Sequence, residues 1–200
     1  MPESNPRRLT KLILYRVDQG TRAALAGKAT HATTGQGQKD LRLRPASQFA
    51  PILKQLLPDR AVRKTHGKNA PEGGYQREVL VGIINWKDPN KDPKEQQAEM
   101  TVWPPNGAKR GGDGEWRIGT IHLFGWDQLV KTDPNGGKSV LMLFKRADGS
   151  VWASFTTESS LRFDNWQRSV REFAVRWFEA DSKAAFADFE AGTEFLNGEG

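Results

Sequence analysis

The segment KSVLMLFKRADGSVWASFTT, residues 138–157, constrains the fold of this chain more than any other stretch. Two runs of strand-forming residues flank the triplet ADG, and this is the pattern of a compact β-hairpin. Five further runs are also typical of strands, at 8–17, 40–44, 75–86, 98–105 and 115–126. Seven short strands predict a mainly β fold, which we expect to be an open, barrel-like sheet.

One short helix is expected between the second and third of these strands. The run ASQFAPILKQLLP changes to helical spacing, with Ser47 as a candidate cap and Pro58 as the stop. Its apolar stripe consists of Phe49, Ile52, Leu53, Leu56 and Leu57.

The pattern changes again after Arg162. Trp166, Val170, Phe173 and Trp177 recur at helical spacing, and Phe186 and Phe189 follow, which predicts an amphipathic helical region. We therefore divide the chain into a β-rich domain, residues 1–160, and a helical extension, residues 161–200, that leads to a linker or a further domain.

Charge is spread unevenly along the chain. Residues 1–70 contain 14 Lys and Arg against 4 Asp and Glu, whereas residues 158–200 contain 5 against 9. A basic half beside a neutral or acidic remainder is typical of a protein with one face against a polyanion, since neutralising phosphates releases counterions. The alternative is a solvated basic face with no partner.

The amino-acid composition argues against several classes of protein. The chain has no Cys and three scattered His, so we expect neither a metal site nor a cofactor. No apolar run approaches the ~18 to 20 residues of a membrane span, and the N-terminus lacks the pattern of a secretion signal. We expect a cytoplasmic protein with no membrane partner.

A catalytic interpretation has little support in the residues. Pro58-Asp59 and Asp92-Pro93-Lys94 formally match the carboxylate and lysine pattern of a metal-dependent nuclease. Asp59 follows a helix stop, however, and Pro93 would break the strand that must align the ligands. We expect no catalytic residues, and a nuclease remains the alternative. A single-strand or RNA binder, with Trp and Phe stacking on bases, is a further alternative.

Two polar segments interrupt the strands and contain the side chains that bind base edges and phosphates. The first, THATTGQGQK, lies in a connection long enough to indicate function. The second is KRGGDGEWR. Together they could form a clamp across a DNA groove. The candidate DNA-binding residues are Arg22, Lys28, Thr30, His31, Thr33, Thr34, Gln36, Gln38, Lys39, Lys109, Arg110, Asp113, Glu115, Trp116 and Arg117.

The order of these elements resembles the N-terminal effector-binding domain of EcoRII-type restriction endonucleases. The resemblance covers residues 8–157 and rests on Thr34-Gly35, the strand closing at Pro45, the helix end Leu56 to Pro58, and EWRI at 115–118. That domain is similar to the DNA-binding pseudobarrel of plant transcription factors. The resemblance implies a seven-stranded open pseudobarrel, residues 1–160, in which two arms, 30–39 and 109–117, enter the major groove.

The resemblance also implies that the domain binds DNA and catalyses no reaction. We expect sequence-specific binding of double-stranded DNA by a monomeric effector or targeting module, covalently linked to a nuclease domain, at a site of the CC(A/T)GG type.

Individual roles follow from side-chain chemistry. Arg110 and Arg117 are candidates for bidentate contact with guanine, and Asp113 and Glu115 could accept from a cytosine amino group. Glu115 could instead orient an arginine. Contacts to phosphates are expected from Arg7, Arg8, Lys11, Arg42 and Arg44. Packing roles are expected for Trp86, Trp103, Trp116, Trp126 and Trp152.

Overall fold

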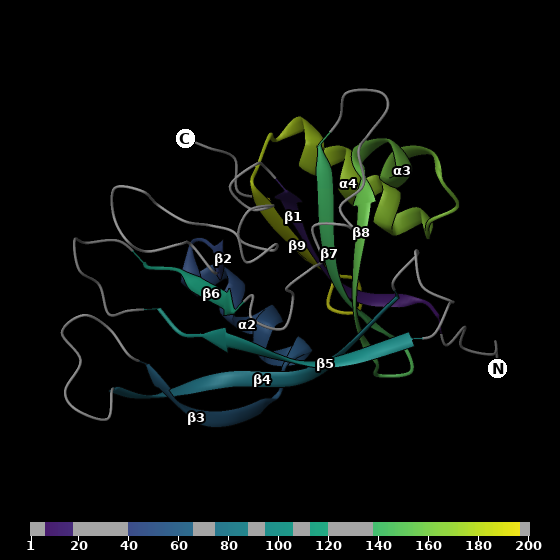
Figure 1. Cartoon of the computed structure of the whole chain (residues 1–200). Helices are drawn as coiled ribbons and strands as arrows, with labels where there is room; N and C mark the ends of the chain where they lie inside the picture. The colour runs from purple at the N-terminus through teal and green to yellow at the C-terminus, as the bar shows by residue number, and fades with distance from the viewer. Residues whose placement is uncertain are drawn as a thin grey trace, which may run out of the picture.

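The computed structural model describes residues 7–17, 40–65, 75–87, 95–105, 113–119 and 138–196. These residues form a ten-stranded sheet that curls into an open half-barrel, together with three helices (Figure 1). None of the helices in these ranges is long and apolar enough to cross a membrane.

The elements follow one another along the chain in the order seen in Figure 1. They are β1 (Leu9–Val17), β2 (Asp40–Leu43), α2 (Ala46–Leu56), β3 (Asp59–Thr65), β4 (Tyr75–Lys87), β5 (Glu95–Trp103), β6 (Trp116–Gly119), β7 (Ser139–Arg146), β8 (Val151–Thr157), α3 (Glu158–Phe163), α4 (Arg168–Glu179), β9 (Ala184–Asp188) and β10 (Thr193–Leu196). The strand order is β10-β9-β1-β7-β8-β4-β5-β6-β2, and β3 pairs with β4 beside this path.

In one half of the sheet, β10-β9-β1-β7-β8, the strands β9, β1, β7 and β8 are largely covered on both faces, and β10 forms the partly exposed edge. All nine residues of β1 are buried, and successive side chains point to opposite faces of a sheet. Ile13 and Tyr15 join the core that contains α2, whereas Leu12 and Leu14 join a second core with α3 and α4. In Figure 1, α3 and α4 lie beside β7 and β8, away from α2.

The other half, β3, β4, β5, β6 and β2, has one face in the core with α2 and a second face that is only partly exposed, since Val79 and Val81 of β4 are buried on it. On β4, Leu80 and Ile84 enter the core with α2, while Ile83 points the other way and is 54% exposed. No helix of the described ranges packs on this second face, which we call the outer face.

The predicted helix stripe is confirmed, since Phe49, Ile52, Leu53 and Leu56 of α2 are all buried. The expected Ser47 cap is wrong. Pro45 occupies the N-cap position, and its side chain makes no hydrogen bond to the helix. The acceptor comes instead from a distant part of the chain, as described below.

The predicted helical extension is only half right. α3 and α4 are helices, but Phe186 lies in β9, which pairs with β1, and β10 pairs with β9. Phe49 of α2 packs edge-on against Phe186, with ring centroids 5.5 Å apart, and against Phe195 of β10 at 5.6 Å. Sequence periodicity failed here because AAFAD is buried on both faces, which removes the alternation that marks a strand.

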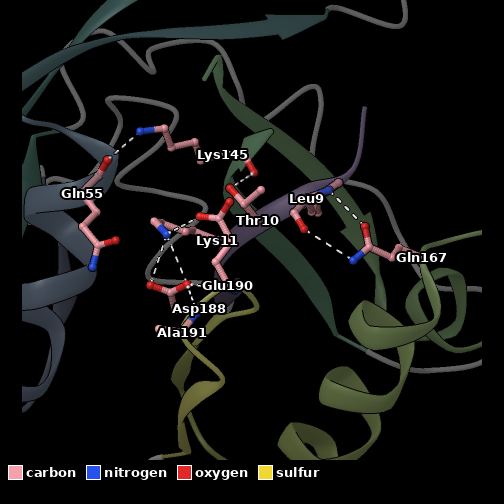
Figure 2. Close-up of polar contacts among 9 residues, drawn as sticks. All are labelled: Leu9, Thr10, Lys11, Gln55, Lys145, Gln167, Asp188, Glu190 and Ala191. Atoms are coloured by element: carbon pink, nitrogen blue, oxygen red, sulfur yellow. Dashed lines mark hydrogen bonds and ion pairs between the residues drawn. The ribbon is translucent and has the colours of Figure 1, made fainter. Parts of the chain in front are cut away.

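An ion cluster fastens this C-terminal hairpin to β1 (Figure 2). Lys11 Nζ lies 3.1 Å from Asp188 Oδ1 and 2.9 Å from Glu190 Oε2. Asp188 also accepts backbone N–H groups of Glu190 and Ala191. The chain after residue 160 is thus part of the same sheet, and Lys11 is buried, so its expected contact with phosphate is wrong.

The strand count also differs from the predicted seven. All seven predicted strands contain an observed strand, and the hairpin at ADG has the expected antiparallel register from Ser139↔Thr157 to Lys145↔Val151. The three additional strands are β3, β9 and β10. The coarse prediction of a mainly β open barrel is confirmed.

Candidate nucleic-acid interface

Alternation along β2 and β6 sorts apolar and basic side chains onto opposite faces. Leu41 and Leu43 of β2 and Ile118 of β6 are buried in the core. Arg42 stands directly opposite Arg117 in the antiparallel ladder, so both occupy the outer face.

The same face continues across β5, β4 and β3. Trp103 of β5 pairs with Arg117, and Arg63 of β3 pairs with Arg77 of β4. Together with Arg44, which follows β2 and is exposed, these basic residues form a row that we call the arginine face: Arg42, Arg44, Arg63, Arg77 and Arg117.

An aromatic ring lies within this row. A Cβ built on Gly119 would meet Nε1 of Trp103 at 3.6 Å and the carbonyl oxygen of Thr101 at 3.3 Å, so the indole lies against the glycine backbone. Trp103 is half-buried, and its pairing with Arg117 makes the two residues neighbours in the ladder.

Arg77 fixes the end of β5 beside this row. Its Nη2 donates to the carbonyl oxygens of Pro104 at 3.1 Å and Pro105 at 2.9 Å. Burial and the positive charge of Arg117 lower the pKa of Arg77 below its ordinary value. An anion bound between the two cations would reduce this repulsion.

Glu115 positions two of the arginines. Its carboxylate lies 3.2 Å from Nη1 of Arg42 and also contacts Arg44, whose side chain is 62% exposed. One carboxylate between two guanidiniums leaves a net positive charge and restricts both side chains.

Asp113 ties the chain before β6 to the start of α2. Its carboxylate accepts from both the backbone N–H and the hydroxyl of Ser47, in the first turn of the helix. These hydrogen bonds lower the pKa of Asp113. Asp113 therefore supplies the capping acceptor that Pro45 cannot, and it anchors the segment that precedes Trp116.

Trp116 has a supporting position. It is buried, and its indole Nε1 donates to the carbonyl oxygen of Ala46 at 2.9 Å. Its ring belongs to the core beneath the arginine face, as the expectation of a packing role required. Trp116 thus holds β6 against α2 while Arg117, the next residue, points outward.

The connections that contain the predicted arms, 30–39 and 109–117, meet the β2–β6 ladder at opposite ends, and the second arm includes Trp116 and Arg117 of β6 itself. Segment 18–39 enters β2 at Asp40, opposite Gly119, while segment 106–112 leads through Asp113 into β6 at Trp116, opposite Leu43. Three residue steps separate these ends, about 10 Å. The DNA major groove is ~12 Å wide, so the two attachment points span a comparable distance.

Most of the predicted DNA-binding residues lie outside the described residues. They are Arg22, Lys28, Thr30, His31, Thr33, Thr34, Gln36, Gln38, Lys39, Lys109 and Arg110. Of the four described candidates, Arg117 lies on the arginine face as one of its guanidiniums. The base-reading roles of Asp113 and Glu115 stay predictions.

Sequence reasoning missed Arg63, Arg77 and the placement of Trp103 on this face. Arg77 could have been found, because inward Leu80 and Ile84 on β4 place the odd-numbered positions on the opposite face of the strand. Arg63 could not, since β3 was not predicted.

The nuclease alternative gains nothing from the described residues. Among them, no three His, Cys, Asp or Glu side chains gather as a metal site would require. Asp59 begins β3 and is exposed, while Asp92, Pro93 and Lys94 lie outside the described ranges.

Comparison with models of known protein families finds no match to this chain, and comparison with curated proteins finds no significant match.

Proposed function

We propose that this chain binds double-stranded DNA in a sequence-specific manner through the arginine face and the two arms that flank it. In this proposal it is the non-catalytic effector or targeting module of an EcoRII-like restriction endonuclease, acts in the cytoplasm as a monomer, and is covalently linked to the nuclease domain. A site of the CC(A/T)GG type is the expected target.

One observation carries the proposal. Arg42 and Arg117 face each other on the outer face of β2 and β6, between the attachment points of two polar, basic segments. A row of guanidiniums on this face, between two attachment points about one groove width apart, suits a duplex backbone and the base edges between its strands.

The residues divide by their chemistry. Arg117 is the candidate for bidentate contact with guanine, because it is the last residue of the second arm and carries five donors in a rigid fork. Arg42 and Arg44 are candidates for phosphate contacts, and Glu115 restrains their side chains through the contacts described above. Arg77 adds positive potential beside Arg117.

A single-strand binder is the rival that the same face supports. Trp103 beside Arg117 offers a ring on which an unpaired base could stack. Duplex binding is favoured by the two widely separated arm attachments, since a single strand requires only one continuous groove.

Affinity for duplex and for single-stranded oligonucleotides, measured across a salt series, tests the proposal. Replacing Arg42 with Ala is expected to weaken duplex binding and to reduce the slope of log affinity against log salt by about 1, the value for one lost phosphate contact. Arg171→Ala is the matched control, because Arg171 is exposed on α4, on the covered half of the sheet.

Two results would contradict the proposal. Equal loss of affinity in the Arg42 and Arg171 variants would mean that net charge alone determines binding. Tighter binding of single strands than of duplex at every salt concentration, lost on Trp103→Ala, would favour the rival.

A further inference from the structure

A second basic and aromatic site lies away from the arginine face. A cavity of about 730 Å³ opens between the start of β1, the β7–β8 hairpin and the connection from α3 to α4. Its basic wall contains Arg7, Arg8 and Arg146, and its aromatic wall contains Trp152 and Trp166. The lining residues that the structure describes include no Asp or Glu.

Arg146 lines this cavity and packs against its aromatic rings. Its guanidinium carbon lies 4.0 Å from the centroid of the Trp152 ring and 5.8 Å from that of Phe144. Within the described part of the chain, its Nε is buried without a hydrogen-bond partner. A guanidinium that rests on an indole presents a planar cation, and such a plane both stacks on a base and donates to an anion.

Hydrogen bonds hold the walls of the cavity in place. Leu9 N–H donates to Oε1 of Gln167 at 3.0 Å, and Nε2 of Gln167 donates to the carbonyl oxygen of Leu9 at 3.4 Å (Figure 2). Nε1 of Trp152 donates to Oγ of Ser150 at 2.8 Å. The α4 helix starts directly after Gln167, so the positive end of its dipole adds to the three arginines.

We propose that this cavity binds a nucleoside phosphate, with the base against Arg146 and the aromatic wall and the phosphate against Arg7 and Arg8. The volume of the cavity exceeds that of a bare phosphate, and an inorganic anion would make no favourable contact with the aromatic wall. The absence of carboxylates from the described lining favours a ligand with negative charge. This site is independent of the duplex-binding face.

The same chemistry has two sources, a free mononucleotide or a nucleotide within a single strand. Calorimetric titration of the full chain with adenosine monophosphate, adenosine, ribose 5-phosphate and a 5′-phosphorylated trinucleotide distinguishes them. Adenosine and ribose 5-phosphate are each expected to bind about tenfold or more weaker than the nucleotide, since each lacks half of the recognised groups. Binding of the trinucleotide with none of the mononucleotide would identify the strand as the source.

Variants locate the site. Arg146→Met is expected to weaken nucleotide binding about tenfold and Arg8→Ala severalfold, whereas Arg171→Ala leaves binding unchanged. Arg8 is exposed, so its variant tests the site even if Arg146→Met fails to fold. Arg117→Ala should leave nucleotide binding intact, which separates this site from the duplex-binding face.

Three outcomes would overturn the inference. They are no saturable binding of either the mononucleotide or the trinucleotide, equal affinity for ribose 5-phosphate and the nucleotide, and equal loss in the Arg8 and Arg171 variants.

Discussion

Asp188→Asn should destabilise the whole sheet, because Asp188 joins the last hairpin to the first strand. The side chain of Asp188 is 5% exposed and that of its partner Lys11 is 9% exposed, so the pair is shielded from water. Breaking a buried ion pair costs about 3 to 5 kcal/mol, and hydrogen bonds to charged groups contribute about 1.5 to 3 kcal/mol each. Glu190 remains beside Lys11 in the variant. We therefore expect a loss of about 2 to 4 kcal/mol, toward the lower part of these ranges.

Thermal and urea unfolding measure this loss. For a chain of this size, about 2 to 4 kcal/mol corresponds to a fall in Tm of about 4 to 16 °C. Glu190→Gln is the matched control: its side chain is 51% exposed. It contacts the same lysine, and an exposed ion pair contributes less than about 1 kcal/mol.

Hydrogen exchange adds the spatial test. Amides of β9 should be as strongly protected as those of β1, since the two strands pair from Lys11↔Asp188 to Tyr15↔Ala184. Unchanged stability in Asp188→Asn, or early exchange of β9 while β1 stays protected, would refute the view that the C-terminal hairpin is integral to the sheet.

Three further predictions concern the core, pH and the arginine face. Gly82→Ala should cost about 1 to 3 kcal/mol by chemical denaturation, because the added Cβ would meet Cδ2 of Leu57 at 2.6 Å; an unchanged midpoint would contradict this packing. Burial opposes the charge of Asp188, but hydrogen bonds from Ala191 and Lys11 outweigh burial and lower the pKa of Asp188. Its contribution to the free energy of unfolding should therefore be constant above the ordinary pKa of about 4 and be lost as pH falls through the lower pKa of the folded state. Asp188→Asn should abolish this pH-dependent loss of stability. Glu115→Gln should raise non-specific duplex affinity at low salt, since it removes the carboxylate between two arginines, and weaker binding at every salt concentration would contradict that role.

Sequence patterns predicted several elements for different reasons. The clean alternation of β2 and the apolar stripe of α2 have one buried face and one exposed face, so periodicity was informative. The β7–β8 hairpin is largely buried on both faces, and its strand-forming runs around the ADG turn identified it instead. β9 was misread as helix because its five residues are all buried, and β3 was missed because its exposed Val62 and charged neighbours leave little apolar pattern. Local patterns report burial, and burial depends on partners that lie far away in the chain.

The sequence predicted the residue types of the candidate site better than their arrangement in space. Alternation placed Arg42 and Arg44 outward, and side-chain chemistry singled out Arg117. The pairing of Arg42 with Arg117 depends on the β2–β6 register, which joins residues about seventy positions apart and cannot be read from either segment alone. The same holds for Asp113, whose bond to Ser47 joins the second arm to α2.

Selection of bound sequences from randomised duplex DNA, at near-physiological salt, tests the central claim most directly. Wild type, Arg117→Ala and the Arg171→Ala control would be compared in parallel. The account predicts a short enriched motif in wild type and in the control, and loss of preference at one guanine position in Arg117→Ala, where a bidentate contact contributes about 1 to 3 kcal/mol. If no motif emerges and affinity only falls with salt, the arginine face is a non-specific polyanion surface and sequence-specific reading is refuted.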